Sequence, residues 1–309
     1  MTFRIILVFF ILLISQGAEL HSEERITIVY TNSLNGNFDY CHCKDDPKGG
    51  LVKRATEIKK IRDNYQNVCL FETGDFFSSD EDALLAEYLI KAYKYIGYDS
   101  ILFGDQEFLG GIDEFIKYKN ELPFVCNNIF IKIGKEWINP YKSYIIIERE
   151  NIKIGIIGSI SKKTFRFYPK EITSKIRIND QIKEINEDIK TLHKEEVDLI
   201  FLLSHSGYDE DKILLRKLKG IDVVIGGHSQ TLVKNPSRVG DSILVQAGTN
   251  GAYIGILELR FNTGKITSFR NSFRLPDEFQ PEDDPYIRKL IDKYKEDIKK
   301  KYQKMRFDK

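Results

Sequence analysis

The chain has 309 residues, with 47 Lys and Arg against 46 Asp and Glu, so its formal net charge at pH 7 is only +1. A chain this close to neutral offers no bulk attraction to nucleic acid or to an anionic membrane surface. A hydrophobic content of 42% and a charged content of 30% are ordinary for a soluble globular protein, and the length is enough for one large domain or two small ones.

Residues 1–18 have the layout of a signal peptide. Arg4 precedes an apolar run over 5–14, and small or polar residues such as Ser15, Gly17 and Ala18 follow. The apolar run is too short to cross a bilayer, which needs about 20 residues. We therefore expect an exported protein, periplasmic or secreted, with no transmembrane span after signal removal. An uncleaved anchor is the alternative.

Apolar strand-like runs alternate with helical patterns through the rest of the chain. The expected strands are 26–30, 68–71, 99–103, 123–126, 145–148, 152–158, 198–203, 222–225, 242–247 and 253–261. The expected helices are 51–65, 81–96, 112–119, 181–194 and 209–218. Such alternation predicts an α/β architecture with mixed, partly parallel sheets. We expect one domain over 25–280, followed by a charged C-terminal helix over 281–309.

Four of the expected strands end in, or are followed by, an Asp or a His, which are side chains that can bind a metal ion. Asp75 and Asp105 each follow a glycine after a strand, His205 ends a strand, and His228 follows two glycines. The carboxyl ends of strands in an open α/β sheet border a common crevice, and glycine lets the backbone approach a ligand closely. Two carboxylates and two imidazoles form a ligand set suited to Zn, Mn or Fe.

A simpler explanation exists for each of these residues taken alone. A strand-end Asp is commonly a helix cap, and a loop His is commonly solvated. The chain has only five His residues, however, and two of them end core strands beside two Gly-Asp ends. This coincidence favours a metal site.

The order of short motifs also resembles a known family. The motifs are Thr31-Asn32-Ser33-Leu34-Asn35-Gly36, Gly74-Asp75, Gly104-Asp105-Gln106-Glu107-Phe108, Ser204-His205-Ser206-Gly207 and Gly226-Gly227-His228-Ser229-Gln230-Thr231. Together they resemble the calcineurin-like metallophosphoesterases, most closely the exported branch of 5′-nucleotidases and cyclic-nucleotide phosphodiesterases. The resemblance covers residues 25 to 295. It implies two packed mixed β-sheets flanked by helices, and a two-metal centre that hydrolyses phosphoesters.

The chain departs from that family on one side of the centre. Ser33 and Asn35 stand where the family has Asp and His ligands, Gln230 replaces a final His ligand, and Gln106 replaces the catalytic His. The shell of the other ion is matched by Asp75, Asp105, His205 and His228. The resemblance thus implies one divalent ion. Gln106 cannot protonate a leaving group.

Two further features bear on function. The exported nucleotidases carry a C-terminal domain that grips the nucleoside, and we expect this chain to lack it, so nucleotide specificity is not inherited. Cys41-His42-Cys43 could bind a soft metal, act in redox chemistry or form a structural disulfide. Three functions stay open: an attenuated or altered hydrolase of a small phosphoester, a non-catalytic metal- or phosphate-binding protein, and a thiol redox or metal-handling protein.

Overall fold

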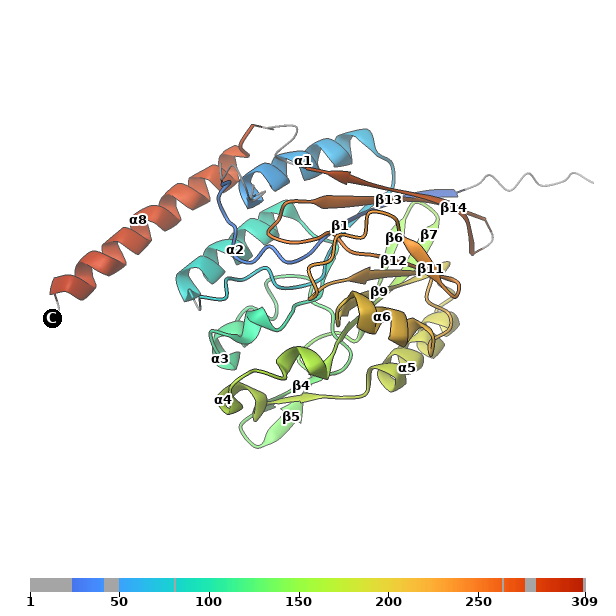
Figure 1. Cartoon of the computed structure of the whole chain (residues 1–309), viewed down its shortest axis with the longest axis horizontal. Helices are drawn as coiled ribbons and strands as arrows, with labels where there is room; N and C mark the ends of the chain where they lie inside the picture. The colour runs from blue at the N-terminus through green and yellow to red at the C-terminus, as the bar shows by residue number, and fades with distance from the viewer. Residues whose placement is uncertain (1–23, 42–49, 81, 263, 276–281, 308–309) are drawn as a thin grey trace, which may run out of the picture.

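The structure is a computed structural model that describes residues 24–41, 50–80, 82–262, 264–275 and 282–307. The predicted signal peptide over 1–18 lies outside the described residues, as do His42 and Cys43. Two large sheets organise the described chain, with a small third sheet at one side (Figure 1).

The first large sheet has the strand order β14-β13-β1-β2-β3. Its strands β1, β2 and β3 are parallel, and β13 and β14 add an antiparallel edge. The bounds are β1 Glu24–Thr31, β2 Val68–Glu72, β3 Ser100–Ile101, β13 Ile254–Asn262 and β14 Lys265–Arg274. The parallel strands therefore all end at the same border of the sheet.

The second large sheet has the order β11-β12-β10-β9-β7-β6. Here β12, β10, β9 and β7 are parallel, while β11 and β6 are antiparallel edges. The bounds are β6 Tyr144–Arg149, β7 Ile152–Ile160, β9 Leu199–His205, β10 Val223–Gly226, β11 Ser237–Val239 and β12 Ser242–Val245. Every residue of β9 is buried, as expected for a parallel strand covered on both faces.

The two large sheets pack on one another through aromatic and branched side chains. Phe71 of β2 and Phe201 of β9 meet edge to face with ring centroids 6.3 Å apart, and both are fully buried. This packing confirms the predicted architecture of two packed mixed sheets. It also sets the carboxyl ends of β2 and β3 opposite those of β9 and β10.

Helices cover the outer faces of the sheets (Figure 1). The helices α1, α2 and α8 pack together beside the first sheet, and α5 and α6 pack against strands of the second. The bounds are α1 Leu51–Asn64, α2 Ala83–Ile96, α3 Ile112–Ile116, α4 Lys170–Thr173, α5 Gln181–Lys194, α6 Tyr208–Leu215 and α8 Pro285–Phe307, with short 3₁₀ turns η1 Gln106–Phe108 and η2 Lys162–Phe165. Among the described residues no helix combines the length and apolar character needed to cross a bilayer.

A third sheet, absent from the sequence predictions, has the order β5-β4-β8. Its strands are β4 Ile129–Ile133, β5 Glu136–Ile138 and β8 Ile176–Ile178. These strands are short and partly exposed, so their apolar pattern is weak. The strand predicted over 123–126 is reduced to isolated bridges, in which Phe124 pairs with Ile101 and Val125 with Lys142.

Candidate metal centre

Four polar side chains meet where the parallel strands of both large sheets end. Asp75 and Asp105 follow β2 and β3, while His205 ends β9 and His228 follows β10. One potential ligand atom from each residue lies within 4.8 Å of the corresponding atoms of the other three. The structure thus brings together the four residues that the sequence singled out.

The orientation of His205 suits a metal ligand. Its Nδ1 lies 2.6 Å from the carbonyl oxygen of Thr73, which can only accept a hydrogen bond, so Nδ1 donates. The other ring nitrogen, Nε2, lies 3.1 Å from Asp105 Oδ1 and 3.3 Å from Asp75 Oδ1. A backbone carbonyl that fixes one ring nitrogen and frees the other is the usual arrangement around metal-bound histidine.

The remaining contacts complete a compact N₂O₂ group. His228 Nδ1 lies 3.0 Å from Asp105 Oδ1, and the Tyr168 hydroxyl donates to Asp105 Oδ2 at 2.8 Å. His205, Asp75 and Asp105 are buried, whereas the His228 side chain is 36% exposed and opens the group to solvent. The donor types and their convergence fit a divalent ion such as Zn, Mn or Fe.

Burial and neighbouring charges shift the pKa values of these side chains. Burial alone would lower the pKa of His205, but the Asp75 and Asp105 carboxylates outweigh it and hold that pKa well above its ordinary value. Burial would raise the pKa of Asp105, yet hydrogen bonds from His205 and His228 hold it well below its usual range. Positive charge is therefore favourable at this point, whether carried by imidazolium or by a metal ion.

The backbone around the group is unusually constrained. A Cβ at Gly104 would lie 2.3 Å from Asp75 Oδ1 and 2.7 Å from His205 Nε2, so only glycine fits there. Asp75 and His228 both adopt positive φ, at 59° and 67°. Non-glycine residues rarely adopt this conformation, and such strain tends to gather at functional sites.

Glu107 organises the loops that carry the two carboxylates, a role that the motif alone did not suggest. Its fully buried carboxylate accepts backbone N–H bonds from Asp75, Phe76, Phe77 and Gly104 at 2.6–3.0 Å. Burial, followed by the charge of Asp75, raises the pKa of Glu107 to about 7. The loop after β2 and the loop after β3 are thus tied to one side chain.

The other half of the predicted centre is filled by neutral side chains. Gln106 Nε2 donates to Asn35 Oδ1 at 3.2 Å, and Asn35 Nδ2 donates to Asn250 Oδ1 at 3.0 Å. The Thr249 hydroxyl accepts from Asn35 Nδ2 at 3.2 Å and donates to Gln230 Oε1 at 2.7 Å. We call these five residues, Asn35, Gln106, Gln230, Thr249 and Asn250, the amide network.

Ser33, two residues before Asn35, is fully buried. Its hydroxyl accepts a hydrogen bond from Asn32 Nδ2 at 3.1 Å. Ser33, Asn35 and Gln230 all have positive φ, at 48°, 52° and 55°, so the strained backbone persists on this side too. None of these side chains carries a charge that could hold a second cation.

The cysteines do not form a thiol centre among the described residues. Cys41 is disulfide-bonded, and His42 and Cys43 lie outside the described part of the chain. Cys69 and Cys126 are free but buried, and burial raises the pKa of each thiol to about 12. Neither of these two is a reactive thiolate at neutral pH.

Comparison with known proteins finds similar chains among 5′-nucleotidases and phosphoesterases. No protein-family model matches the chain. A snake venom 5′-nucleotidase from Gloydius brevicauda is 29% identical, over 77% of this chain and 45% of its own length. The solved 5′-nucleotidase precursor of Thermus thermophilus superimposes with a TM-score of 0.80 at 20% identity, over 89% of this chain and 59% of that one. The calcineurin-like phosphoesterase YfkN of Bacillus subtilis gives a TM-score of 0.74 at 20% identity, over 89% and 98%.

The fold is that of the solved 5′-nucleotidase precursor and calcineurin-like phosphoesterase to which the chain is similar. Curated proteins similar to the chain in sequence include 5′-nucleotidases, at 26–29% identity. The chain spans about half the length of the curated relatives it matches, between 45% and 55% for those from Gloydius brevicauda and Bos taurus.

Proposed function

We propose that this chain is an exported 5′-nucleotidase-like protein that holds a single divalent ion, Zn, Mn or Fe, and acts on a small phosphoester with attenuated or altered hydrolase activity. Asp75, Asp105, His205 and His228 are the proposed ligands. Export rests on the signal-like pattern of residues 1–18.

The asymmetry of the centre carries this proposal. On one side, four potential ligand atoms lie within 4.8 Å of one another. On the other, Asn35, Gln106 and Gln230 belong to a hydrogen-bonded amide network with no ionisable group. A dication needs anionic or imidazole ligands to offset its dehydration, so only the first side is equipped to hold one.

The chemistry available to such a site is limited by position 106. A bound ion supplies Lewis acidity, which polarises a phosphoryl oxygen and acidifies water. The Thr73 carbonyl oxygen fixes the ring of His205, and the Tyr168 hydroxyl orients Asp105. Gln106 can donate a hydrogen bond but cannot transfer a proton, which forfeits a factor of about 10²–10⁴ in rate.

A non-catalytic binding protein is the second candidate. The observation that favours it is the contact between Gln106 and Asn35, because it ties the residue at the leaving-group position to a neighbouring amide. In that case the ion would retain a phosphate-like ligand without turnover.

Metal analysis of purified protein tests the ligand set. We expect one divalent ion per wild-type chain by inductively coupled plasma mass spectrometry, and near-complete loss of it in Asp105→Ala and His228→Ala. His193→Ala is the matched control, because His193 is an exposed histidine on α5, outside the group. Equal metal in all four proteins, or none in the wild type, would overturn the proposed site.

The same proteins separate the two candidate functions. Hydrolysis of p-nitrophenyl phosphate and bis-p-nitrophenyl phosphate is measured with and without the metal. Slow turnover that is lost in both site variants and kept in His193→Ala supports the hydrolase. Stoichiometric metal with no turnover of either ester supports the binding protein.

A further inference from the structure

A groove lies beside the metal centre, between the third sheet and the loop that follows β7. Its volume is about 1010 Å³. Trp137 of β5 and Arg177 of β8 line it on one side, Lys162 and Phe165 of η2 line it on another, and Gln181 at the start of α5 closes it. We call it the Trp137 groove. Its size is in the range of small-molecule sites.

The groove carries an excess of uncompensated positive charge. Lys162, Arg166 and Arg177 line it, all three are exposed, and no carboxylate within the described residues forms an ion pair with any of them. Arg177 lies over the Trp137 ring, 4.5 Å from its centroid, which supplies no oxygen acceptor for the guanidinium N–H donors. The cations are therefore available to an outside anion.

The two acidic residues of the groove already have partners. Glu210 receives both of its contacts from Lys163 Nζ, at 2.8 Å each. Asp180 caps α5 by accepting a hydrogen bond from the Lys183 backbone at 2.9 Å. Counting Lys163, the lining carries four cations against these two carboxylates, which leaves a net charge of +2.

Apolar surface lies next to these cations. Trp137 of β5 and Ile176 and Ile178 of β8 are half-buried in the wall of the groove, whereas Phe165 is only 6% exposed. A ligand that bears both oxyanion groups and an apolar portion would satisfy both kinds of lining. An inorganic anion would contact only the cationic lining.

We propose that the Trp137 groove binds a small organic polyanion, with at least two oxyanion groups on Lys162, Arg166 and Arg177 and an apolar portion against Ile176 and Ile178. This site stands apart from the metal ligands, none of which lines the groove. Contact between the two sites is indirect. Phe165 packs on Tyr168, which donates to Asp105, and Gln181 donates to Ser206, next to His205.

The chain supplies its own reporter for this site, because Trp137 is its only tryptophan. The full-length protein is stripped of metal with a chelator, which is then removed by dialysis, and tryptophan fluorescence is followed during titration with benzene-1,3-disulfonate or with pyrophosphate. The chelator removes the metal, so the proposed function of the metal centre can fail without affecting this result. For variants that change the surroundings of Trp137, such as Arg177→Ala, binding is also measured by calorimetry.

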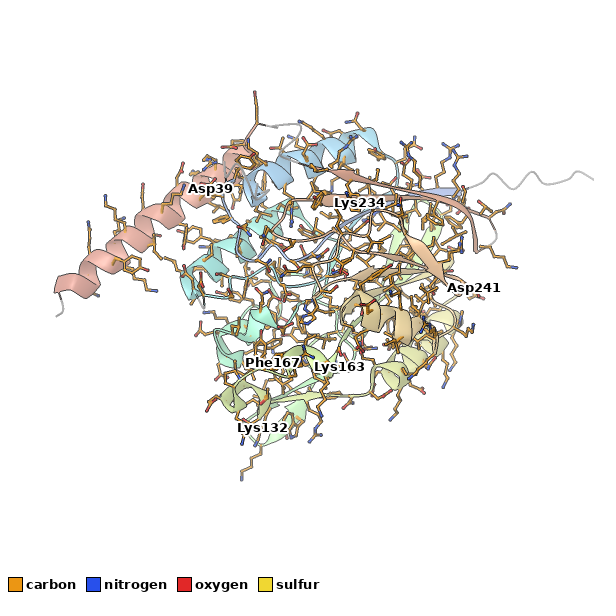
Figure 2. All side chains as sticks on the ribbon, viewed as in Figure 1. Asp39, Lys132, Lys163, Phe167, Lys234 and Asp241 are labelled. Carbon is orange, nitrogen blue, oxygen red and sulfur yellow. The ribbon has the colours of Figure 1, made fainter. Side chains whose placement is uncertain are left out.

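We expect a saturable fluorescence change, with the disulfonate bound more tightly than pyrophosphate. Arg177→Ala and Lys162→Ala should each weaken binding by about tenfold, the loss expected for one charge-assisted contact. Lys234→Ala removes the same charge from an exposed site away from Lys163 and the groove (Figure 2) and should bind like the wild type.

Two results would overturn the proposal. One is the absence of any saturable change with either probe. The other is equal weakening in Arg177→Ala and Lys234→Ala, which would mean attraction to overall charge and not to the groove. Pyrophosphate bound as tightly as the disulfonate would overturn the apolar part of the assignment.

Discussion

The candidate ligand group and the amide network differ in the charge of their side chains more than in their backbone conformation. His228 and Gln230 are two residues apart and share a positive φ, yet one points to Asp105 and the other accepts a hydrogen bond from Thr249. Ser33 and Asn35 adopt the same conformation. The backbone of the amide network is therefore compatible with side chains other than those it carries.

Restoring ionisable side chains should create a second metal site. The triple variant Ser33→Asp, Asn35→His and Gln230→His places one carboxylate and two imidazoles near Asp75, on a backbone that Asp and His tolerate at positive φ. We expect bound metal, measured by mass spectrometry, to rise from one ion to two per chain.

The control for this variant is the triple change with His228→Ala added, which should lose one ion and keep the new one. A folded triple variant that still binds a single ion would show that the amide network does not occupy the position of a second ion. Circular dichroism establishes that each protein is folded.

The candidate ligands at the strand ends could be predicted from the sequence, because glycine, aspartate and histidine after an apolar run form a local pattern. The partners of those residues could not. Tyr168 reaches Asp105 from 63 positions along the chain, and no spacing rule connects them. Glu107 lay within a recognised motif, but its four backbone bonds depend on how the loop after β2 folds over it.

Single elements carry their own electrostatic consequences, and α6 is an example. Its Asp211 is fully buried against the second sheet, and the Ser204 hydroxyl donates to its Oδ1 at 2.6 Å. Its Oδ2 has no hydrogen-bond partner within the described residues. Burial raises the pKa of Asp211 to about 7, with the Ser204 bond opposing that shift.

This raised pKa predicts a pH dependence of stability. Below the ordinary pKa of Asp, the folded and the unfolded state both bind the proton, and Asp211 makes its full contribution to the unfolding free energy. As pH rises through the native pKa of about 7, that contribution is lost. One such group changes the unfolding free energy by at most about 1.4 kcal/mol per pH unit.

Urea unfolding at pH 5 and pH 7.5 in chelator measures the effect. Asp211→Asn cannot ionise, so we expect a smaller loss of stability between the two pH values than in the wild type. Asp209→Asn is the matched control on the same helix, with a side chain that is 86% exposed. Identical pH slopes in wild type and Asp211→Asn would contradict the assignment.

Helix α5 could be predicted from local sequence signals, whereas the third sheet could not. The helix predicted over 181–194 coincides with α5, because its apolar spacing and its Asp180 cap are both local signals. The third sheet was missed because β5 and β8 have only three residues each, and their pairing with β4 is decided by tertiary contacts.

On the scale of the whole molecule, the candidate ligands join two separately built layers. Asp75 and Asp105 extend from the first sheet, and His205 and His228 extend from the second. An ion bound by all four would bridge the sheets on one side of the Phe71–Phe201 contact. Folding and metal binding should therefore be linked.

Metal should raise the unfolding free energy of the wild type. With free metal at 100 times its dissociation constant, linkage gives about 2.7 kcal/mol. Urea unfolding with and without Zn²⁺ or Mn²⁺ measures this gain, which His228→Ala should abolish and His193→Ala should keep. Stability that is indifferent to metal in the wild type would contradict a bridging ion.

The third sheet has a consequence for how such a protein can diversify. Residues 129–178 supply Trp137 and Arg177 to the groove, but none of the four candidate metal ligands. Within this stretch the Tyr168 hydroxyl donates to Asp105, and the Ser161 backbone N–H donates to the His205 carbonyl oxygen at 3.0 Å. The residues proposed to bind the polyanion and those proposed to bind the metal thus lie in largely separate stretches of sequence. Exchanging the groove residues of this segment between related chains, with β7 and Tyr168 kept, should change ligand preference and leave metal binding intact.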